Sequence, residues 1–300
     1  MTHFTAAVLQ MRSGVDPDAN ARVMAEMIDA AVAKGATYIQ TPEMTGMVQR
    51  DRAGLDAKLK REDEDVIVRT AADLARRHGV SIHVGSVAVA VDGGMIANRA
   101  FLFGPDGARL ATYDKIHMFD VDLDNGESWR ESATYRPGTA AGIADLTLEG
   151  GPVRLGFGVC YDMRFPQLFR AEALAGAEVL TAPAAFTRQT GEAHWHVLLR
   201  ARAIENGAFM IAAAQGGVHE DCRETYGHSI IIDPWGRVIA EVDGAEPGIA
   251  YAEIDTAAVV EARKKIPNLK NARDFAAPSL GAGFSAAGVA GAAGAAGAAE

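Results

Sequence analysis

The chain has few cysteines, no long apolar run and no excess of basic residues. Its only cysteines, Cys160 and Cys222, could in principle pair, but a chain of 300 residues without an export signal has little reason to carry a disulfide, so we expect both thiols to be reduced. The absence of about 18 consecutive apolar residues argues against a membrane span, and the N-terminus has no export-signal pattern. Lys and Arg total 29 against 39 Asp and Glu, without a basic cluster. These absences predict a soluble, cytoplasmic protein that binds neither membranes nor nucleic acid.

The chain does contain a long alternation of strand-like and helix-like segments, and 49% of its residues are hydrophobic, enough for a large core. Strand patterns are found at 4–11, 37–43, 81–91, 177–184, 209–215 and 248–254, and helix patterns at 16–33, 64–78, 165–176, 191–206 and 256–265. A charged loop is expected at 49–63, and DGG at 92–94 is expected to form a hairpin turn. Helices alternating with strands and hairpins predict a mixed α/β fold.

One pattern occurs twice. Residues 99–114 and 228–243 both combine a strand, a Pro-x-Gly turn and a second strand. Such turns are common in hairpins, so the match could be coincidental, but a pseudo-twofold pair of sheets would also produce it.

The composition changes near the C-terminus. From Ser279 the chain is almost entirely Ala and Gly. These residues have too little side chain to bury against the entropy of ordering them. We therefore expect one domain over residues 1–278 and a flexible tail over 279–300.

The stretch VRLGFGVCYDMRFP, residues 153–166, is the most informative in the chain. Its apolar, β-branched run places Cys160 at the end of a buried strand, where α/β proteins carry out their chemistry. A lone cysteine in that position is most often an inert core residue. A nucleophile also needs a base and a group that stabilises an oxyanion. Glu43 and Lys115, which both follow strand-like runs, offer those groups.

Glu43, Lys115 and Cys160 in this order, with the strings GVCYDMRFP, AFTRQTGEAHWHVLLRARAIEN and YGHSIIIDPWG, resemble the nitrilase (carbon-nitrogen hydrolase) superfamily over residues 4–275. The strings are most similar to the amidase branch that contains deaminated-glutathione amidase and omega-amidase. The resemblance implies a four-layer α-β-β-α sandwich with mixed sheets and a cofactor-independent enzyme. It also implies a homodimer or larger homo-oligomer, for which the segment LLRARAIEN, 198–206, is a candidate interface.

The resemblance assigns a role to each candidate catalytic residue. Glu43 would take the Cys160 proton and pass it to the departing nitrogen, so that an amine or ammonia leaves instead of an anion. Lys115 would stabilise the oxyanion together with the backbone N–H of Tyr161. Glu131 would hold the lysine and position the substrate. Taken singly, each of these charged residues would more often be a solvated surface group.

Four further residues are candidates for substrate binding. Arg164 resembles the arginines that bind a substrate carboxylate in carbamoyl-amino-acid hydrolases of the superfamily, a task that suits a guanidinium. Alternatively, it pairs with Asp162 or lies in a dimer interface. Phe186, Thr187 and Arg188 are expected to line the pocket.

The remaining reactive residues indicate no second chemistry. His194 and His196 flank a tryptophan, but no histidine pair has the spacing of zinc peptidases, so we expect neither a metal nor another cofactor. Glu205 is interpreted as a structural salt-bridge partner, and Cys222, in a polar loop, as a bystander.

The residues and the resemblance together predict a cysteine amidase. Its substrate would be a small carboxylate-bearing primary amide, with deaminated glutathione first, cleaved through a thioester. Omega-amidase and N-carbamoyl hydrolase activities remain alternatives, and nitrile hydrolysis is less favoured. A non-catalytic scaffold that keeps Cys160 as a core residue is the alternative from another class.

Overall fold

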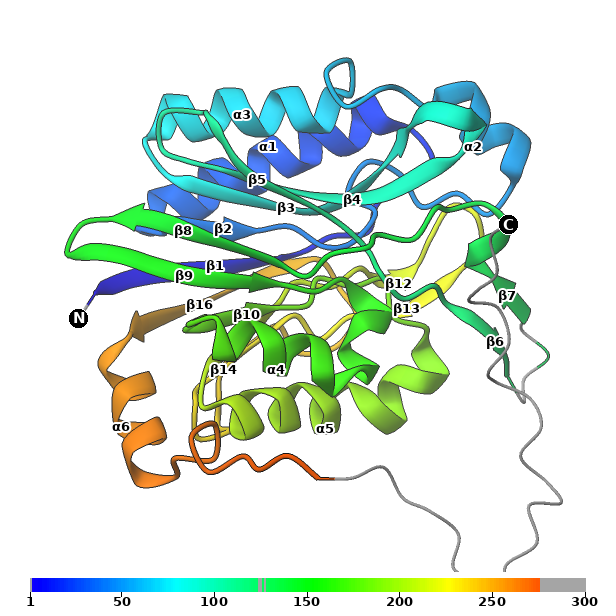
Figure 1. Cartoon of the computed structure of the whole chain (residues 1–300). Coiled ribbons are helices and arrows are strands. Elements are labelled where there is room, and N and C mark those ends of the chain that lie inside the picture. Colours follow the sequence, from blue (N-terminus) through cyan, green and yellow to red (C-terminus); the bar gives the residue numbers. More distant parts are fainter. Residues whose placement is uncertain (1, 124–125, 127, 276–300) are drawn as a thin grey trace, which may run out of the picture. The chain divides into compact units, whose positions relative to one another are not determined.

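The computed structural model describes residues 2–123, 126 and 128–275 (Figure 1). In chain order the helices and strands are β1 (His3–Gln10), α1 (Pro17–Ala33), β2 (Tyr38–Gln40), α2 (Arg52–Lys58), α3 (Val66–His78), β3 (Ser81–Ala90), β4 (Ile96–Phe103), β5 (Arg109–Asp114), β6 (Asp120–Asp122), β7 (Ser128–Arg130), β8 (Gly142–Leu148), β9 (Gly151–Phe157), α4 (Pro166–Leu174), β10 (Val179–Thr181), α5 (Arg188–Asn206), β11 (Phe209–Ala212), β12 (Gly216–Val218), β13 (Glu224–Tyr226), β14 (Ile230–Ile232), β15 (Val238–Glu241), β16 (Gly248–Asp255) and α6 (Ala257–Lys265). The mixed α/β class is confirmed.

The first helices begin and end where local side chains satisfy the backbone. The Asp16 carboxylate accepts a hydrogen bond from the N–H of Asp18 at 3.0 Å, and Pro17 is the first helical residue of α1. Asp65 caps α3 in the same way. Gly79 ends that helix with a φ of 67°, a left-handed conformation that glycine adopts without strain.

The strands form two six-stranded sheets with the same internal pattern. Their orders are β16-β1-β2-β3-β4-β5 and β15-β14-β11-β10-β9-β8. In each sheet three neighbouring strands pair parallel, and every other pairing of neighbouring strands is antiparallel. The repeated segments 99–114 and 228–243 contain the equivalent hairpins β4–β5 and β14–β15. The two sheets therefore share one strand order with these hairpins at equivalent places, as a pseudo-twofold pair of sheets would have.

The two sheets pack against each other between two helical layers. Along β1, Ala6 and Val8 join the core shared with the second sheet, while Ala7 and Leu9 pack in the core beneath α1 and α3. Figure 1 shows α1 and α3 on the outer side of the first sheet and α4 and α5 on that of the second. This is the predicted α-β-β-α sandwich.

Three details differ from the expectations or lie outside the described residues. Helix α2 lies inside the expected loop 49–63. The sequence did not predict it, because a short helix with one buried residue, Leu55, has almost no hydrophobic pattern. Helix α5 begins at Arg188, three residues earlier than expected. The predicted domain end at 278 and the tail 279–300 lie outside the described residues. Within the part of the chain that the structure describes, no helix is long and apolar enough to cross a membrane.

Candidate active site

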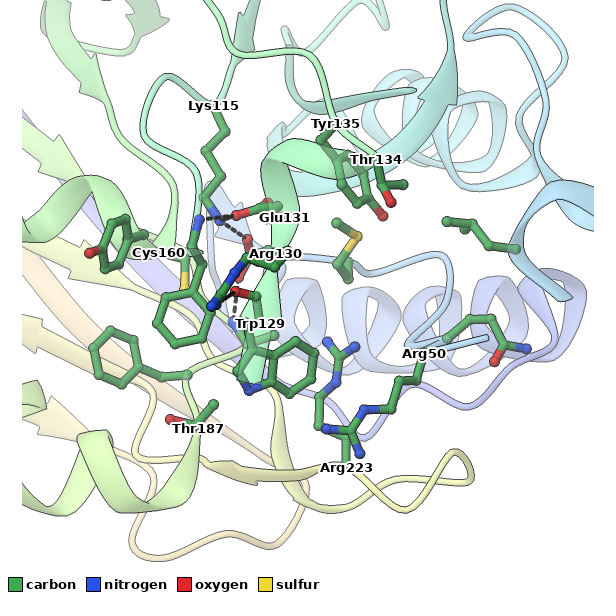
Figure 2. Close-up of a pocket in the computed structure, with 18 of the residues that line it drawn as sticks. Arg50, Lys115, Trp129, Arg130, Glu131, Thr134, Tyr135, Cys160, Thr187 and Arg223 are labelled. Carbon is green, nitrogen blue, oxygen red and sulfur yellow. Dashed lines mark hydrogen bonds and ion pairs between the residues drawn. The ribbon is translucent and has the colours of Figure 1, made fainter. Parts of the chain in front are cut away.

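A cavity of about 290 Å³ lies beyond the ends of strands from both sheets (Figure 2). Glu43 follows β2, Lys115 follows β5 and Cys160 follows β9, so the side chains converge where α/β sheets usually place their ligands. Seven of the nine predicted site residues line its wall: Glu43, Lys115, Glu131, Cys160, Tyr161, Phe186 and Thr187.

Lys115 connects the two predicted carboxylates. Its Nζ lies 3.0 Å from Oε1 of Glu43, and 3.0 and 2.8 Å from Oε1 and Oε2 of Glu131. The lysine side chain is only 2% exposed. A buried ammonium needs paired, hydrogen-bonded carboxylates to remain charged, and this cluster supplies two.

Cys160 occupies a sharp turn after β9. Its φ of 51° is unusual for a residue with a side chain, and its N–H donates to the carbonyl of Pro183 at 2.9 Å. The residue is 7% exposed, and its thiol donates a hydrogen bond to the Glu43 carboxylate. The turn therefore presents the sulfur to the cavity and to a base at once.

The three charged or acidic groups set each other's protonation. Burial would raise the pKa of Glu43, but the Lys115 charge and hydrogen bonds from Cys160, Lys115 and the Ala185 N–H hold it below its usual value. Burial, with the Glu43 charge, raises the pKa of the Cys160 thiol well above its usual range. Burial would lower the pKa of Lys115, but Glu131 and Glu43 raise it. At neutral pH the site thus holds a thiol, a carboxylate and an ammonium.

Asn98 is a site residue that sequence reasoning missed. Its Nδ2 donates to Glu43 at 2.9 Å and to Glu131 at 3.3 Å, so one amide from β4 fixes both carboxylates. Its position 55 residues from Glu43 in the sequence leaves no local signal that could have identified it.

Asp162 positions the cysteine turn and was also missed. Its fully buried carboxylate accepts hydrogen bonds from the Tyr113 hydroxyl at 2.8 Å, the Val159 N–H at 2.9 Å and the His117 N–H at 3.0 Å. These bonds attach the residues on either side of Cys160 to the segment that carries Lys115.

Gly85 in β3 allows the loops of the two sheets to approach. A Cβ at this position would lie 2.2 Å from the Thr41 carbonyl oxygen and 2.5 Å from Cβ of Pro183. Thr41 precedes Glu43 by two residues, and Pro183 accepts the Cys160 N–H. The missing side chain therefore helps to set the separation of base and nucleophile.

The structure does not bring Arg164 and Arg188 to the cavity wall. The Arg164 guanidinium stacks on Tyr161 and Phe186, with its carbon 5.7 and 5.4 Å from the ring centroids. Arg188 pairs with Glu192 and Glu224 at the surface. The expectation that Arg188 lines the pocket is therefore wrong. The proposed carboxylate contact of Arg164 has no support in this geometry, and Asp162, its alternative partner, bonds to other groups.

Other reactive residues lie apart from the cavity wall. Glu205 pairs with Arg202 at 2.8 Å, as expected for a structural salt bridge, and Cys222 is a free, exposed thiol. His196, His228 and Glu241 form the one metal-like cluster among the described residues. Both imidazoles already hydrogen-bond to the same Glu241 oxygen, at 2.8 and 2.7 Å. One ring nitrogen of each histidine is thus partnered by Glu241 without an ion.

Comparisons with known proteins identify the class to which this site belongs. The carbon-nitrogen hydrolase family model matches residues 5–264. A deaminated glutathione amidase of Synechocystis sp. (strain PCC 6803 / GT-S) is 39% identical over 278 residues, 90% of this chain and 98% of the relative. The C. elegans NitFhit structure has a TM-score of 0.81 at 33% identity, covering 90% of this chain and 65% of that one.

A third similar structure is a mutant of the amidase from Nesterenkonia sp. AN1, which shows Michael addition of acrylamide at its active site cysteine. It has a TM-score of 0.72 at 25% identity and covers 88% of this chain and 98% of its own. The chain belongs to the carbon-nitrogen hydrolase family. It is an amidase with the nitrilase fold, a hydrolase of carbon-nitrogen bonds other than peptide bonds.

Proposed function

We propose that the protein is a cysteine amidase that uses Cys160 as nucleophile and hydrolyses a small carboxylate-bearing amide, with deaminated glutathione as the first candidate. The observation that carries this proposal is the contact between a buried neutral thiol and an ionised Glu43, beside the Lys115 ammonium on the cavity wall. A base in direct contact with a thiol can remove its proton as the sulfur attacks.

The reaction has two halves, formation and hydrolysis of a thioester, and each half needs two proton transfers. In the first half, the Cys160 sulfur attacks the amide carbon while Glu43 takes the thiol proton, and the oxyanion lies against Lys115 and the backbone N–H of Tyr161. Glu43 returns the proton to the nitrogen, the C–N bond breaks, and a thioester remains. In the second half, Glu43 takes a proton from water as the water attacks the thioester, and returns it to the sulfur.

Glu131 has a different role in this scheme. It contacts Lys115 through both carboxylate oxygens and also accepts the Phe119 N–H at 2.7 Å, but it makes no hydrogen bond to Cys160. Its charge keeps the lysine protonated and in place. Glu131 is therefore a positioning residue in our proposal, with Glu43 as the only proton carrier.

Deaminated glutathione fits this chemistry in a specific way. Its amide is secondary, and not the primary amide expected from the sequence, so the leaving group is the amine of cysteinylglycine, and the α-keto acid portion stays on the sulfur. The preference for this compound rests on the name of the Synechocystis relative and on the resemblance of the site strings. Omega-amidase and N-carbamoyl hydrolase activities are the alternatives that the assay must separate.

A mass-spectrometric assay with deaminated glutathione, α-ketoglutaramate, an N-carbamoyl amino acid and a simple nitrile tests the proposal. We expect release of cysteinylglycine by the unaltered protein and none by Cys160→Ala. The exposed Cys222 remains in both proteins, so it serves as an internal control for the second thiol. Turnover of the nitrile alone, or more than a few per cent activity in Cys160→Ala, would contradict the proposal.

We also propose that the protein forms a homodimer or larger homo-oligomer through α5. The resemblance to the superfamily supports this, and Val197 and Ile204 on that helix are 68% and 50% exposed. Exposed apolar side chains favour association with a second copy. Light scattering should give at least twice the chain mass of 31.6 kDa, and a monomer at micromolar concentration would refute the assembly.

A further inference from the structure

Among the described residues, four arginines line the cavity: Arg50, Arg52, Arg130 and Arg223. Carboxylates already neutralise two of them, Arg52 and Arg130. Arg52 Nε lies 2.8 Å from both carboxylate oxygens of Asp56, and Arg130 Nη2 lies 2.9 and 2.8 Å from those of Asp122. Such paired contacts satisfy the guanidinium charge, so these two arginines have little capacity for a ligand anion.

Arg50 and Arg223 are instead held by an aromatic ring. Their guanidinium carbons lie 4.7 and 4.5 Å from the centroid of the Trp129 indole, both within the range of a cation–π contact. The arginines belong to different segments: Arg50 precedes α2, and Arg223 lies between β12 and β13. Figure 2 shows both side chains reaching toward Trp129, which comes from β7.

The charges of these two arginines are only weakly compensated. Arg50 is exposed and has no ion pair with any residue in the described ranges. Arg223 is 16% exposed, and its nearest carboxylate oxygen, on Asp221, is 3.9 Å from Nε. That Nε is buried without a hydrogen-bond partner among the described residues. Two cations held on one ring with unused donors form a site whose charge suits an anion.

Arg50 and Arg223 lie in the same cavity as the reacting groups but apart from them. In the view of Figure 2, Cys160 and Lys115 lie on one side, Arg50 and Arg223 on the other, and Trp129 between them. Glu43 and Glu131 already neutralise Lys115, so that lysine offers no free charge to a substrate carboxylate. A carboxylate bound by the arginines would belong to a part of the substrate remote from the scissile amide.

We propose that Arg50, Arg223 and Trp129 form a binding subsite for the remote carboxylate of an extended amide substrate. This inference rests on the proposed function and adds a substrate class to it: amides whose leaving amine carries a carboxylate. In deaminated glutathione that group is the glycine carboxylate. The two guanidinium groups donate to it, while the indole holds them in place and limits the ordering cost of binding.

Binding in the Cys160→Ala background tests the subsite without turnover. Calorimetry would compare deaminated glutathione with its C-terminal amide, which differs only in lacking the remote charge. We expect the acid to bind roughly 10-fold to 100-fold more tightly than the amide, the range expected for hydrogen bonds to a charged group. Adding Arg223→Gln or Arg50→Gln should remove most of that difference. Arg52→Gln, which removes a neutralised cavity arginine, should preserve it.

Three results would overturn the inference: equal binding of acid and amide, preserved discrimination in both Arg223→Gln and Arg50→Gln, or an equal loss in Arg52→Gln. Arg50 is exposed, so its variant remains informative even if the more buried Arg223→Gln fails to fold. Turnover of deaminated glutathione by the unaltered protein is measured separately. Its absence would count against the proposed function, whereas the acid-to-amide ratio decides the subsite.

Discussion

Replacing Glu43 with glutamine should abolish proton transfer at the site while keeping two of the hydrogen bonds that hold this side chain. The amide keeps an oxygen that can accept from Lys115 and Asn98 at the present 3.0 and 2.9 Å. It loses the hydrogen bond from the Ala185 N–H, a cost of about 1 kcal/mol in stability. It cannot take a proton from Cys160. Loss of a general base lowers turnover by about 10²–10⁴-fold, so we expect a folded protein with that defect.

Alkylation of the thiol by iodoacetamide isolates this step because it needs no substrate. In the unaltered site the pKa of Glu43 is lowered and that of Cys160 is raised, so the rate should be flat across about pH 6–8. In Glu43→Gln the thiol has no base, and the rate should rise about tenfold per pH unit with the thiolate fraction.

Glu131→Gln is the matched control for this experiment. It removes the same charge from the Lys115 cluster but makes no contact with the sulfur, so the flat profile should persist. A flat profile in Glu43→Gln, or a turnover loss below tenfold, would refute Glu43 as the base.

Three further substitutions test the surroundings of the site. Gly85→Ala places a Cβ 2.2 Å from the Thr41 carbonyl oxygen, so we expect the protein to lose about 1–3 kcal/mol of stability and kcat to fall strongly. A wild-type melting temperature and wild-type turnover would contradict this. Asp162→Asn replaces a buried acceptor with an amide that cannot accept all three bonds, so Tm and kcat should both fall, whereas unchanged kcat would exclude a positioning role. Glu172 is 1% exposed, and burial together with the Asp162 charge raises its pKa well above its usual value. The stability this carboxyl contributes is therefore complete below about pH 4.3 and lost as pH rises through the raised pKa. Glu172→Gln should then raise Tm by about 2 °C or more at pH 8 and much less at pH 4, and an equal gain at both would contradict the assignment.

Local patterns predicted much of this molecule because many of its features depend on local residues. The Asp16 and Pro17 signal marks the start of α1, and apolar runs before Glu43 and Cys160 indicate strands whose ends meet at one edge of the fold. The repeated hairpin pattern was compatible with two equivalent sheets, and the strand orders match in this way. The relative placement of Glu43, Lys115 and Cys160 came from the resemblance of whole strings, because no periodicity relates such distant positions.

The residues that were missed depend on contacts between distant segments. Asn98 reads as an ordinary polar residue in a strand until β4 lies beside the Glu43 loop. Arg50, Trp129 and Arg223 come from three segments with no shared pattern, yet they meet on one indole. Arg164 has a suggestive place in the sequence, but its side chain stacks on two aromatic rings and does not line the cavity.

Competition between water and hydroxylamine tests the central claim, a thioester on Cys160, most directly. Deaminated glutathione and α-ketoglutaramate differ in the leaving group but would leave the same acyl group on the sulfur. If both pass through that thioester, hydroxylamine must give the same ratio of hydroxamate to acid from either substrate, and Cys160→Ala must give neither product. Ratios that differ between the two substrates, or hydroxamate formation by Cys160→Ala, would contradict the acyl-enzyme on Cys160.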